Sequence, residues 1–145
     1  MQAVVTIHIA APFSFNNASK GYRQATGFIV DTDLGIIMTS RHVVSEGPMQ
    51  ARAVFRSGAP LSKARARECP IELFHVEPIH DFAYCKFDVK ALGDLPLKAI
   101  QLRPDLAKVG QEIRVLGNDM VQDMSILTGV ISRVDSDPPP WDSCR

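Results

Sequence analysis

The 145-residue sequence has no long hydrophobic run, no net charge and no signature of secretion. Its apolar stretches are far shorter than the roughly 20 residues of a membrane-spanning helix, so we predict none. Residues 1–9 lack the positive leader and cleavage pattern of a secretory signal and resemble a strand instead. Sixteen basic residues balance sixteen acidic ones, which gives no general attraction to nucleic acid or anionic membrane.

Cysteine is scarce, which excludes a disulfide framework as the basis of the fold. The three cysteines, Cys69, Cys85 and Cys144, are widely spaced and form no Cys-x-x-Cys pair. This pattern favours reduced thiols in an intracellular compartment, although it leaves room for one disulfide. His75 and His80 add potential metal ligands, but none of the familiar zinc spacings is present. We therefore predict neither a metal nor a cofactor.

Long amphipathic helices are also missing, and short apolar runs take their place. Val5, Ile7 and Ile9 alternate with polar neighbours, the period expected of a half-buried strand. Similar runs, rich in Val, Ile, Leu and Phe, predict strands at residues 1–9, 25–31, 35–40, 51–55, 71–77, 82–87, 112–116 and 125–134. Residues 13–24 are expected to form an exposed loop, and residues 31–35 and 117–119 to form turns. The chain is thus predicted to be all-β, an antiparallel barrel or sandwich.

Two of these runs carry chemically useful side chains at their ends. His42 follows the strand predicted at residues 35–40, with Val43 and Val44 in one short turn, and Asp81 precedes the apolar run at 82–87. A histidine followed later by an aspartate is the order that one family of serine hydrolases uses for its general base and orienting acid. Strand ends suit this task because they hold a side chain rigidly at an open rim. His42 and Asp81 are therefore the candidate catalytic residues.

Several motifs in register resemble the HtrA/Deg family of trypsin-like serine proteases, most closely the fungal and plant branch with two protease-like units. They are Thr26-Gly27-Phe28-Ile29-Val30-Asp31, Arg41-His42-Val43-Val44, His80-Asp81-Phe82 and the run at residues 109–119, within a resemblance that covers residues 4–135. The resemblance implies that His42 is the general base and Asp81 its orienting acid, acting on polypeptide substrates. It also implies a nuclear, pro-apoptotic setting.

The same resemblance implies a division of the chain. Residues 1–108 would form the first trypsin-like six-stranded barrel and residues 109–135 the opening strands of an incomplete second barrel. Residues 136–145 would form an irregular tail, because Pro138, Pro139 and Pro140 lack the backbone donors of a central strand. Without partner strands, residues 111–134 are expected to expose an apolar face and to aggregate or remain partly disordered.

The nucleophile is the missing part of this constellation. The family places its serine in a Gly-x-Ser-Gly-type loop of the second barrel, and no such sequence occurs here. Ser125 and Ser132 lie in a strand pattern and Ser143 in the tail, so none is assigned. A base and an acid alone cannot form an acyl-enzyme. We expect a truncated or degenerate protease sequence, and the alternative is a catalytically inactive protease-like domain that binds peptides or partner proteins along a strand edge. The oligomeric state stays open.

Two further features have simpler interpretations. His80 is expected to be structural, because strand alternation would point it away from the face that Asp81 occupies. A basic stretch is interpreted as a solvated loop, since no aromatic residues are interleaved as in single-strand nucleic-acid binding, and a nucleic-acid partner is disfavoured. Its members are Arg52, Arg56, Lys63, Arg65 and Arg67.

Overall fold

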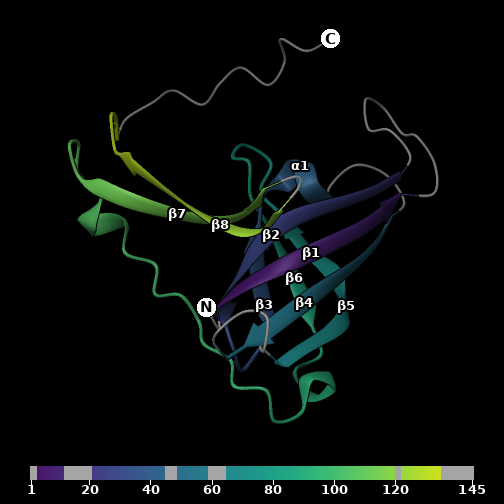
Figure 1. Ribbon diagram of the computed structural model, residues 1–145. Coiled ribbons are helices and arrows are strands. Elements are labelled where there is room, and N and C mark those ends of the chain that lie inside the picture. The colour runs from purple at the N-terminus through teal and green to yellow at the C-terminus, as the bar shows by residue number, and fades with distance from the viewer. Residues whose placement is uncertain (1–2, 12–20, 45–48, 59–64, 120–121, 135–145) are drawn as a thin grey trace.

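The computed structural model describes residues 3–11, 21–44, 49–58, 65–119 and 122–134. Six strands form a closed antiparallel barrel, and two more form a separate two-stranded sheet (Figure 1). The strands are β1 (Val4–Ala11), β2 (Gly21–Asp31), β3 (Ile36–Thr39), β4 (Gln50–Ser57), β5 (Arg65–Val76), β6 (Ala83–Phe87), β7 (Glu112–Asp119) and β8 (Gln122–Val130). The short helices are α1 (Arg41–Val44) and the 3₁₀ helices η2 (Val89–Leu92) and η3 (Pro104–Leu106). The all-β, six-stranded barrel prediction is confirmed.

The barrel closes in the order β1-β2-β3-β6-β5-β4, with β4 pairing back to β1. Ile7 of β1 is opposite Ala25 of β2 on one side and Ala53 of β4 on the other. Each barrel strand therefore has a hydrogen-bonded neighbour on both sides, which removes exposed sheet edges.

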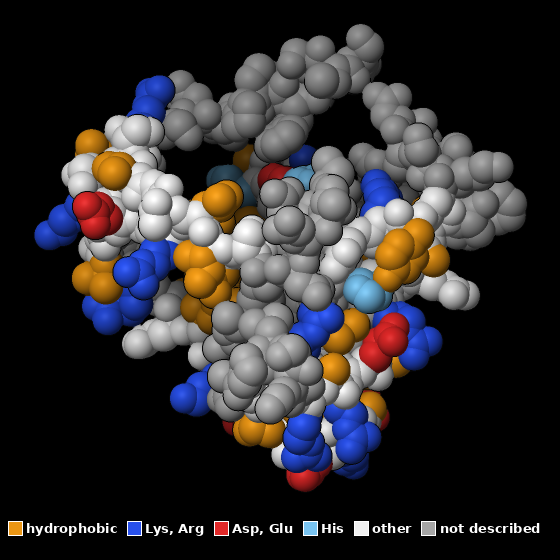
Figure 2. Space-filling model, viewed as in Figure 1, with side chains coloured by type: hydrophobic (Ala, Val, Ile, Leu, Met, Phe, Trp, Pro, Cys, Tyr) orange, Lys and Arg blue, Asp and Glu red, His pale blue; other side chains and the backbone are white. Residues whose placement is uncertain are grey.

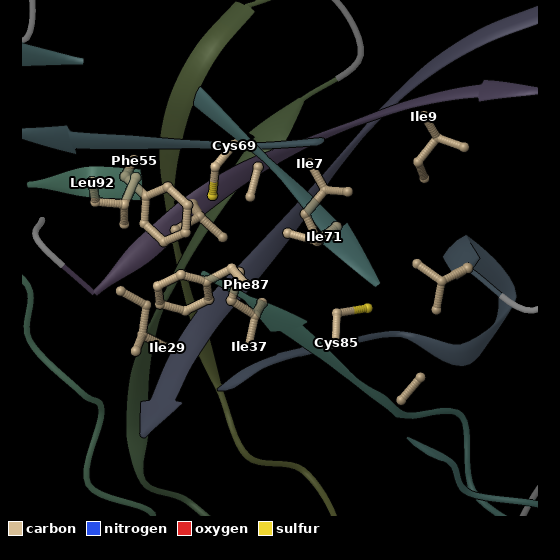
Figure 3. Packing of buried hydrophobic residues seen from close by; sticks show 14 of the residues in the cluster. Ile7, Ile9, Ile29, Ile37, Phe55, Cys69, Ile71, Cys85, Phe87 and Leu92 are labelled. Atoms are coloured by element: carbon tan, nitrogen blue, oxygen red, sulfur yellow. The ribbon is translucent and has the colours of Figure 1, made fainter. Parts of the chain in front are cut away.

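The barrel interior is filled by the alternate apolar residues of its strands. Phe55 of β4 and Phe87 of β6 pack with ring centroids 4.7 Å apart at one end of the core (Figure 3). The core cluster is Val5, Ile7, Ile9, Ile29, Ile37, Val44, Ala53, Phe55, Cys69, Ile71, Ala83, Cys85, Phe87, Leu92 and Leu95. Leu92 and Leu95 come from the segment after β6, so this connection is part of the barrel core.

Several strands are longer than their apolar patterns. Residues 21–24, expected in a loop, belong to β2 and pair with the end of β1. Of the basic stretch interpreted as a loop, Arg52 and Arg56 lie in β4, and Arg65 and Arg67 lie in β5, which pairs with β4. The loop prediction for these residues is wrong because the main-chain hydrogen bonds of a barrel extend a strand whatever the polarity of its outward side chains. Residues 13–20 and Lys63 lie outside the described residues.

The β2–β3 turn was predicted and is confirmed. Asp31 Oδ1 accepts hydrogen bonds from the main-chain N–H groups of Asp33 (2.9 Å) and Leu34 (2.8 Å). Gly35 has φ +67°, a conformation that favours glycine, and its carbonyl accepts the N–H of Phe87 at 2.9 Å. This hydrogen bond attaches the turn to β6. The strand β3 then runs from the turn to α1.

The sheet formed by β7 and β8 is a hairpin outside the barrel, with β7 next to β2 (Figure 1). The turn expected at residues 117–119 is wrong, since pairing continues to Asp119 opposite Gln122. Hydrophobic side chains are exposed on this hairpin, and Figure 2 shows such side chains at the surface on that side of the molecule. The expected apolar exposure is present, whereas aggregation stays a prediction.

Candidate functional site

His42 lies at the rim of the barrel, on the single turn of α1 that follows β3. Thr39 ends β3 and donates its hydroxyl to the carbonyl of Thr26 at 2.9 Å, which ties the strand end to β2. Val44 anchors the other end of the turn in the core. Between these anchors the His42 side chain is 65% exposed. The backbone is fixed, while the imidazole remains accessible.

Asp81 lies in the connection between β5 and β6, two positions before β6 begins at Ala83. This connection closes on itself, because the N–H of Glu77 donates to the carbonyl of Phe82 at 3.1 Å and the N–H of Phe82 donates to the carbonyl of His80 at 2.9 Å. The Asp81 side chain is 23% exposed. It is therefore held in a compact turn rather than at the end of a flexible loop.

The structure brings His42 and Asp81 into direct contact although 39 positions separate them in the sequence. Oδ2 of Asp81 lies 2.6 Å from Nδ1 of His42, and Oδ1 accepts the main-chain N–H of His42 at 3.0 Å. One carboxylate thus holds both the ring and the backbone of the histidine. This double contact fixes the orientation of the imidazole.

The charge state of Asp81 follows from this geometry. Burial raises its pKa, but the hydrogen bonds from the backbone and ring of His42 and the positive charges of His42 and Arg41 outweigh burial and hold the pKa below its ordinary value. The carboxylate is therefore ionised at neutral pH and can only accept hydrogen bonds. It follows that Nδ1 of His42 carries the proton and donates it, which leaves Nε2 on the accessible edge of the ring.

His80 has no part in this contact, as expected, but the reason given by strand alternation is wrong. Residues 78–81 form a bend rather than a strand. The His80 ring stacks on Phe82, with centroids 6.2 Å apart, and its Nδ1 lies 3.7 Å from Oε1 of Glu77. His80 therefore packs within the connection that carries Asp81.

The other candidate ligands and charges are dispersed. Cys69 and Cys85 are buried free thiols, and burial raises the pKa of each to about 11. Across the part of the chain that the structure describes, no three His, Cys, Asp or Glu side chains gather as a metal site would require. Basic residues pair with acids: Arg52 with Glu68 at 2.8 Å and Arg65 with Asp94 at 2.9 Å. The absence of a metal and a nucleic-acid partner stays a prediction.

Serine hydroxyls do not complete the site among the described residues, where no hydrogen bond joins one to His42. Ser125 lies in β8, and its Oγ is 3.4 Å from the carbonyl oxygen of Gly117. Ser132 follows β8, and Ser143 lies outside the described residues. Within the described ranges, His42 and Asp81 are thus paired with each other and with no serine hydroxyl.

Two features of the site were not assigned from the sequence. Arg41 extends from α1 to the β5–β6 connection, where its Nη1 donates to the carbonyl of Pro78 at 2.7 Å. In the sequence, Arg41 was named only as the first residue of the motif that contains His42.

A groove of about 430 Å³ lies beside His42 and is lined by Ile9, Tyr22, Arg23, Gln24, Ala25, His42 and Val43. No sequence pattern indicated this groove, because residues 22–24 were expected in a loop.

Comparisons with known proteins agree with this geometry. A family model described as a trypsin-like peptidase domain matches residues 25–143. The pro-apoptotic serine protease NMA111 of Eremothecium gossypii is 43% identical over 141 residues, covering 97% of this chain and 14% of that protein. The corresponding protein of Aspergillus niger is 42% identical over 141 residues, covering 97% and 13%. The chain thus spans only a small part of the length of these relatives.

Solved structures show the same fold. The crystal structure of Deg5 superimposes with a TM-score of 0.68 at 20% identity, covering 91% of this chain and 58% of that chain. The HtrA-type protease AlgW with tripeptide gives 0.66 at 22% identity, covering 91% and 36%. Among the described residues, no helix is long and apolar enough to cross a membrane. From the matched family model and the curated relatives, the chain belongs to the trypsin-like peptidase family and is homologous to the NMA111 serine proteases.

Proposed function

We propose that this chain is the N-terminal part of an HtrA/Deg-like serine endopeptidase, with His42 as general base and Asp81 as the acid that orients it. The observation that carries the proposal is the double contact of the Asp81 carboxylate with the ring and backbone of His42, at 2.6 and 3.0 Å. A base used for acyl transfer needs a fixed tautomer and a stabilised imidazolium, and an ionised partner at Nδ1 provides both.

In the proposed reaction, Nε2 of His42 takes the proton of a serine hydroxyl while the serine oxygen attacks the carbonyl carbon of a peptide bond. The resulting imidazolium is stabilised by Asp81, and it then transfers the proton to the leaving amine as the tetrahedral intermediate collapses. No serine of this sequence is assigned as the nucleophile. We propose that the nucleophile and the donors of the oxyanion hole belong to a second barrel, and that the 145-residue chain alone does not hydrolyse peptide bonds.

The division into units is part of the proposal. Residues 1–108 would be the first barrel and residues 109–135 the start of the second, while the tail expected at residues 136–145 lies outside the described residues. The exposed hydrophobic residues of β7 and β8 support this division, because Val115 and Leu127 lie opposite each other in the hairpin and are 50% and 62% exposed. Further strands packed on the hairpin would bury such residues.

The cellular setting is a further part of the proposal. The curated relatives are named pro-apoptotic serine proteases, and Cys69 and Cys85 are free thiols, which suits a reducing compartment. We propose an intracellular, nuclear protein that acts on polypeptides. Imaging of the tagged protein in its own cells tests this placement, and exclusion from the nucleus would contradict it.

A chimera tests the catalytic assignment. Residues 1–134 of this chain replace the matching segment of the Eremothecium gossypii protein, which is 43% identical to it. The chimera should react with a fluorophosphonate probe and cleave an unfolded protein substrate, whereas the 145-residue chain alone should do neither. His42→Ala in the chimera should lower the cleavage rate by at least about 10³-fold, since base and nucleophile act as one unit.

His80→Ala is the matched control, because His80 neighbours Asp81 without contacting His42, and it should retain most of the activity. A folded chimera that is inactive, or equal activity of the His42→Ala and unmodified chimeras, would contradict the proposed function. The first outcome would favour the peptide-binding alternative. Labelling of the 145-residue chain at a serine would overturn the assignment of the nucleophile to a second barrel.

A further inference from the structure

Arg41 connects the two loops that form the site. It lies beside His42 on α1, and its half-buried side chain reaches the β5–β6 connection. In this connection, Nη1 of Arg41 donates to the carbonyl of Pro78 at 2.7 Å and approaches the carbonyl of Glu77 at 3.5 Å. These two carbonyls lie at the start of the β5–β6 connection, and Asp81 lies near its end.

The two neighbouring residues of α1 therefore hold the same connection at two points. Arg41 contacts its first residues through their backbone, and His42 contacts its last residue, Asp81, through two hydrogen bonds. Backbone carbonyls cannot rotate away as side chains can, so a donor fixed on them fixes the path of the chain. A guanidinium suits this role because its planar group presents several donors in fixed directions, whereas an ammonium acts as a point charge.

We propose that Arg41 is a positioning residue that holds the β5–β6 connection against α1, so that the Asp81 carboxylate meets both the ring and the main-chain N–H of His42. The catalytic meaning of this role rests on the proposed function, but the positioning itself does not. The hydrogen bonds of Arg41 to the β5–β6 connection are made with the carbonyls of Glu77 and Pro78. Arg41 therefore acts through Asp81.

The charge of Arg41 has a separate effect from its hydrogen bonds. Together with the contacts from His42, this positive charge helps to hold the pKa of Asp81 below its ordinary value. Glu77 and His80 are the other titratable groups of the connection, and they lie 3.7 Å apart from each other. A substitution that keeps the positive charge but not the planar guanidinium can therefore separate the effect on the position of the connection from the effect on the pKa of Asp81.

The experiment measures Arg41→Met and Arg41→Lys by NMR in the 145-residue chain. Hydrogen exchange of the His42 amide reports its bond to Asp81, and a carboxyl titration reports the Asp81 pKa. Both variants should exchange the His42 amide about 3- to 10-fold faster than the wild type, the effect of weakening one hydrogen bond. The Asp81 midpoint should rise in Arg41→Met and stay closer to the wild-type value in Arg41→Lys.

Arg103→Met is the matched control, since it removes an exposed arginine that pairs with Asp105 at 2.8 Å, and it should change neither readout. The amide of Phe87, which donates to Gly35 at 2.9 Å, is the internal reference for global stability. Wild-type exchange at His42 in both Arg41 variants would overturn the proposal. Equal acceleration at His42 and Phe87 would also overturn it, because the role would then be general stability. An inactive chimera would contradict the proposed function and leave these results standing.

Discussion

The barrel and the β7–β8 hairpin are made of similar apolar antiparallel strands, yet the same residue type is buried in the barrel and exposed in the hairpin. Ile7 in β1 is 0% exposed, whereas Ile126 in β8 is 56% exposed. Both residues lie in strands with hydrophobic neighbours. Burial here is therefore decided by closure of the sheet and not by the composition of a strand.

The difference in burial arises because a barrel strand has partners on both edges and a shared interior, whereas a hairpin strand has neither. A barrel strand pairs on both sides and turns one face toward a common interior, so alternate residues leave water together. The hairpin pairs only with itself and meets the barrel locally, where Gly117 approaches Thr26. Its remaining apolar area stays in water, and it adds little hydrophobic stabilisation.

The largest difference in stability is expected when the same substitution, Ile→Ala, is made once in the barrel and once in the hairpin. Ile7→Ala should reduce the free energy of unfolding by about 2–5 kcal/mol, because it removes buried methyl groups and leaves a cavity. Ile126→Ala should change it by less than about 0.5 kcal/mol, as at most exposed sites. Urea unfolding followed by circular dichroism measures both, and equal losses would break the distinction between the two regions.

A pair of glycines provides the next largest contrast. An added Cβ at Gly35 would clash with the carbonyl oxygen of Phe87, and φ is +67° there, so Gly35→Ala should cost about 1–3 kcal/mol of stability through strain. At Gly129 in β8 the nearest atom to such a Cβ, from Ile113, is 3.8 Å away. Gly129→Ala should leave the unfolding midpoint unchanged. A loss at Gly129 equal to that at Gly35 would show that the hairpin is packed more tightly than its exposure indicates.

A third contrast concerns two carboxylates, one at the barrel rim and one before the hairpin. Because the pKa of folded Asp81 lies below its ordinary value of 3.8, the unfolded chain binds more protons in acid. The stabilisation by Asp81 should be present above pH 3.8 and be lost as the pH falls through the folded pKa. Asp81→Asn should cost about 1 kcal/mol at neutral pH and weaken this dependence on pH.

The matched substitution is Asp105→Asn. Asp105 also has a lowered pKa, through its hydrogen bond with Arg103, but both side chains of this pair are exposed. Salt and water screen such pairs, so no change in stability should be measurable. Unfolding curves from pH 2 to 7 check both variants. If the stability of Asp81→Asn depended on pH as that of the wild type does, the lowered pKa of Asp81 would not be the source of the pH dependence.

The smallest effect on stability is expected from charging the exposed hairpin. Val115→Glu combined with Leu127→Lys places opposite charges on a cross-strand pair and should alter stability by less than about 0.5 kcal/mol. The same variant should stay monomeric at concentrations where the wild type associates, because it removes an exposed apolar patch. Sedimentation velocity measures this. Unchanged association would mean that the hairpin is not the surface through which the chain self-associates.

Sequence patterns predicted much of this arrangement. The alternation at Val5, Ile7 and Ile9 identified β1, and the residues around Gly35 identified the turn that leads to His42. They failed for residues 21–24 and 65–70, whose strand structure comes from pairing with neighbours rather than from local hydrophobicity. They also failed for His80, because alternation applies only inside a strand and residues 78–81 bend.

The all-β class, the apolar strand cores and the two candidate residues could be predicted from the sequence, since they depend on local periodicity and on the residue types that acyl transfer requires. The contacts of Asp81 with the ring and backbone of His42, and of Arg41 with Pro78, are visible only in the folded chain. These contacts join residues 37 to 39 positions apart. Their geometry follows from the closure of the barrel, which places α1 beside the β5–β6 connection, and no local pattern encodes that closure.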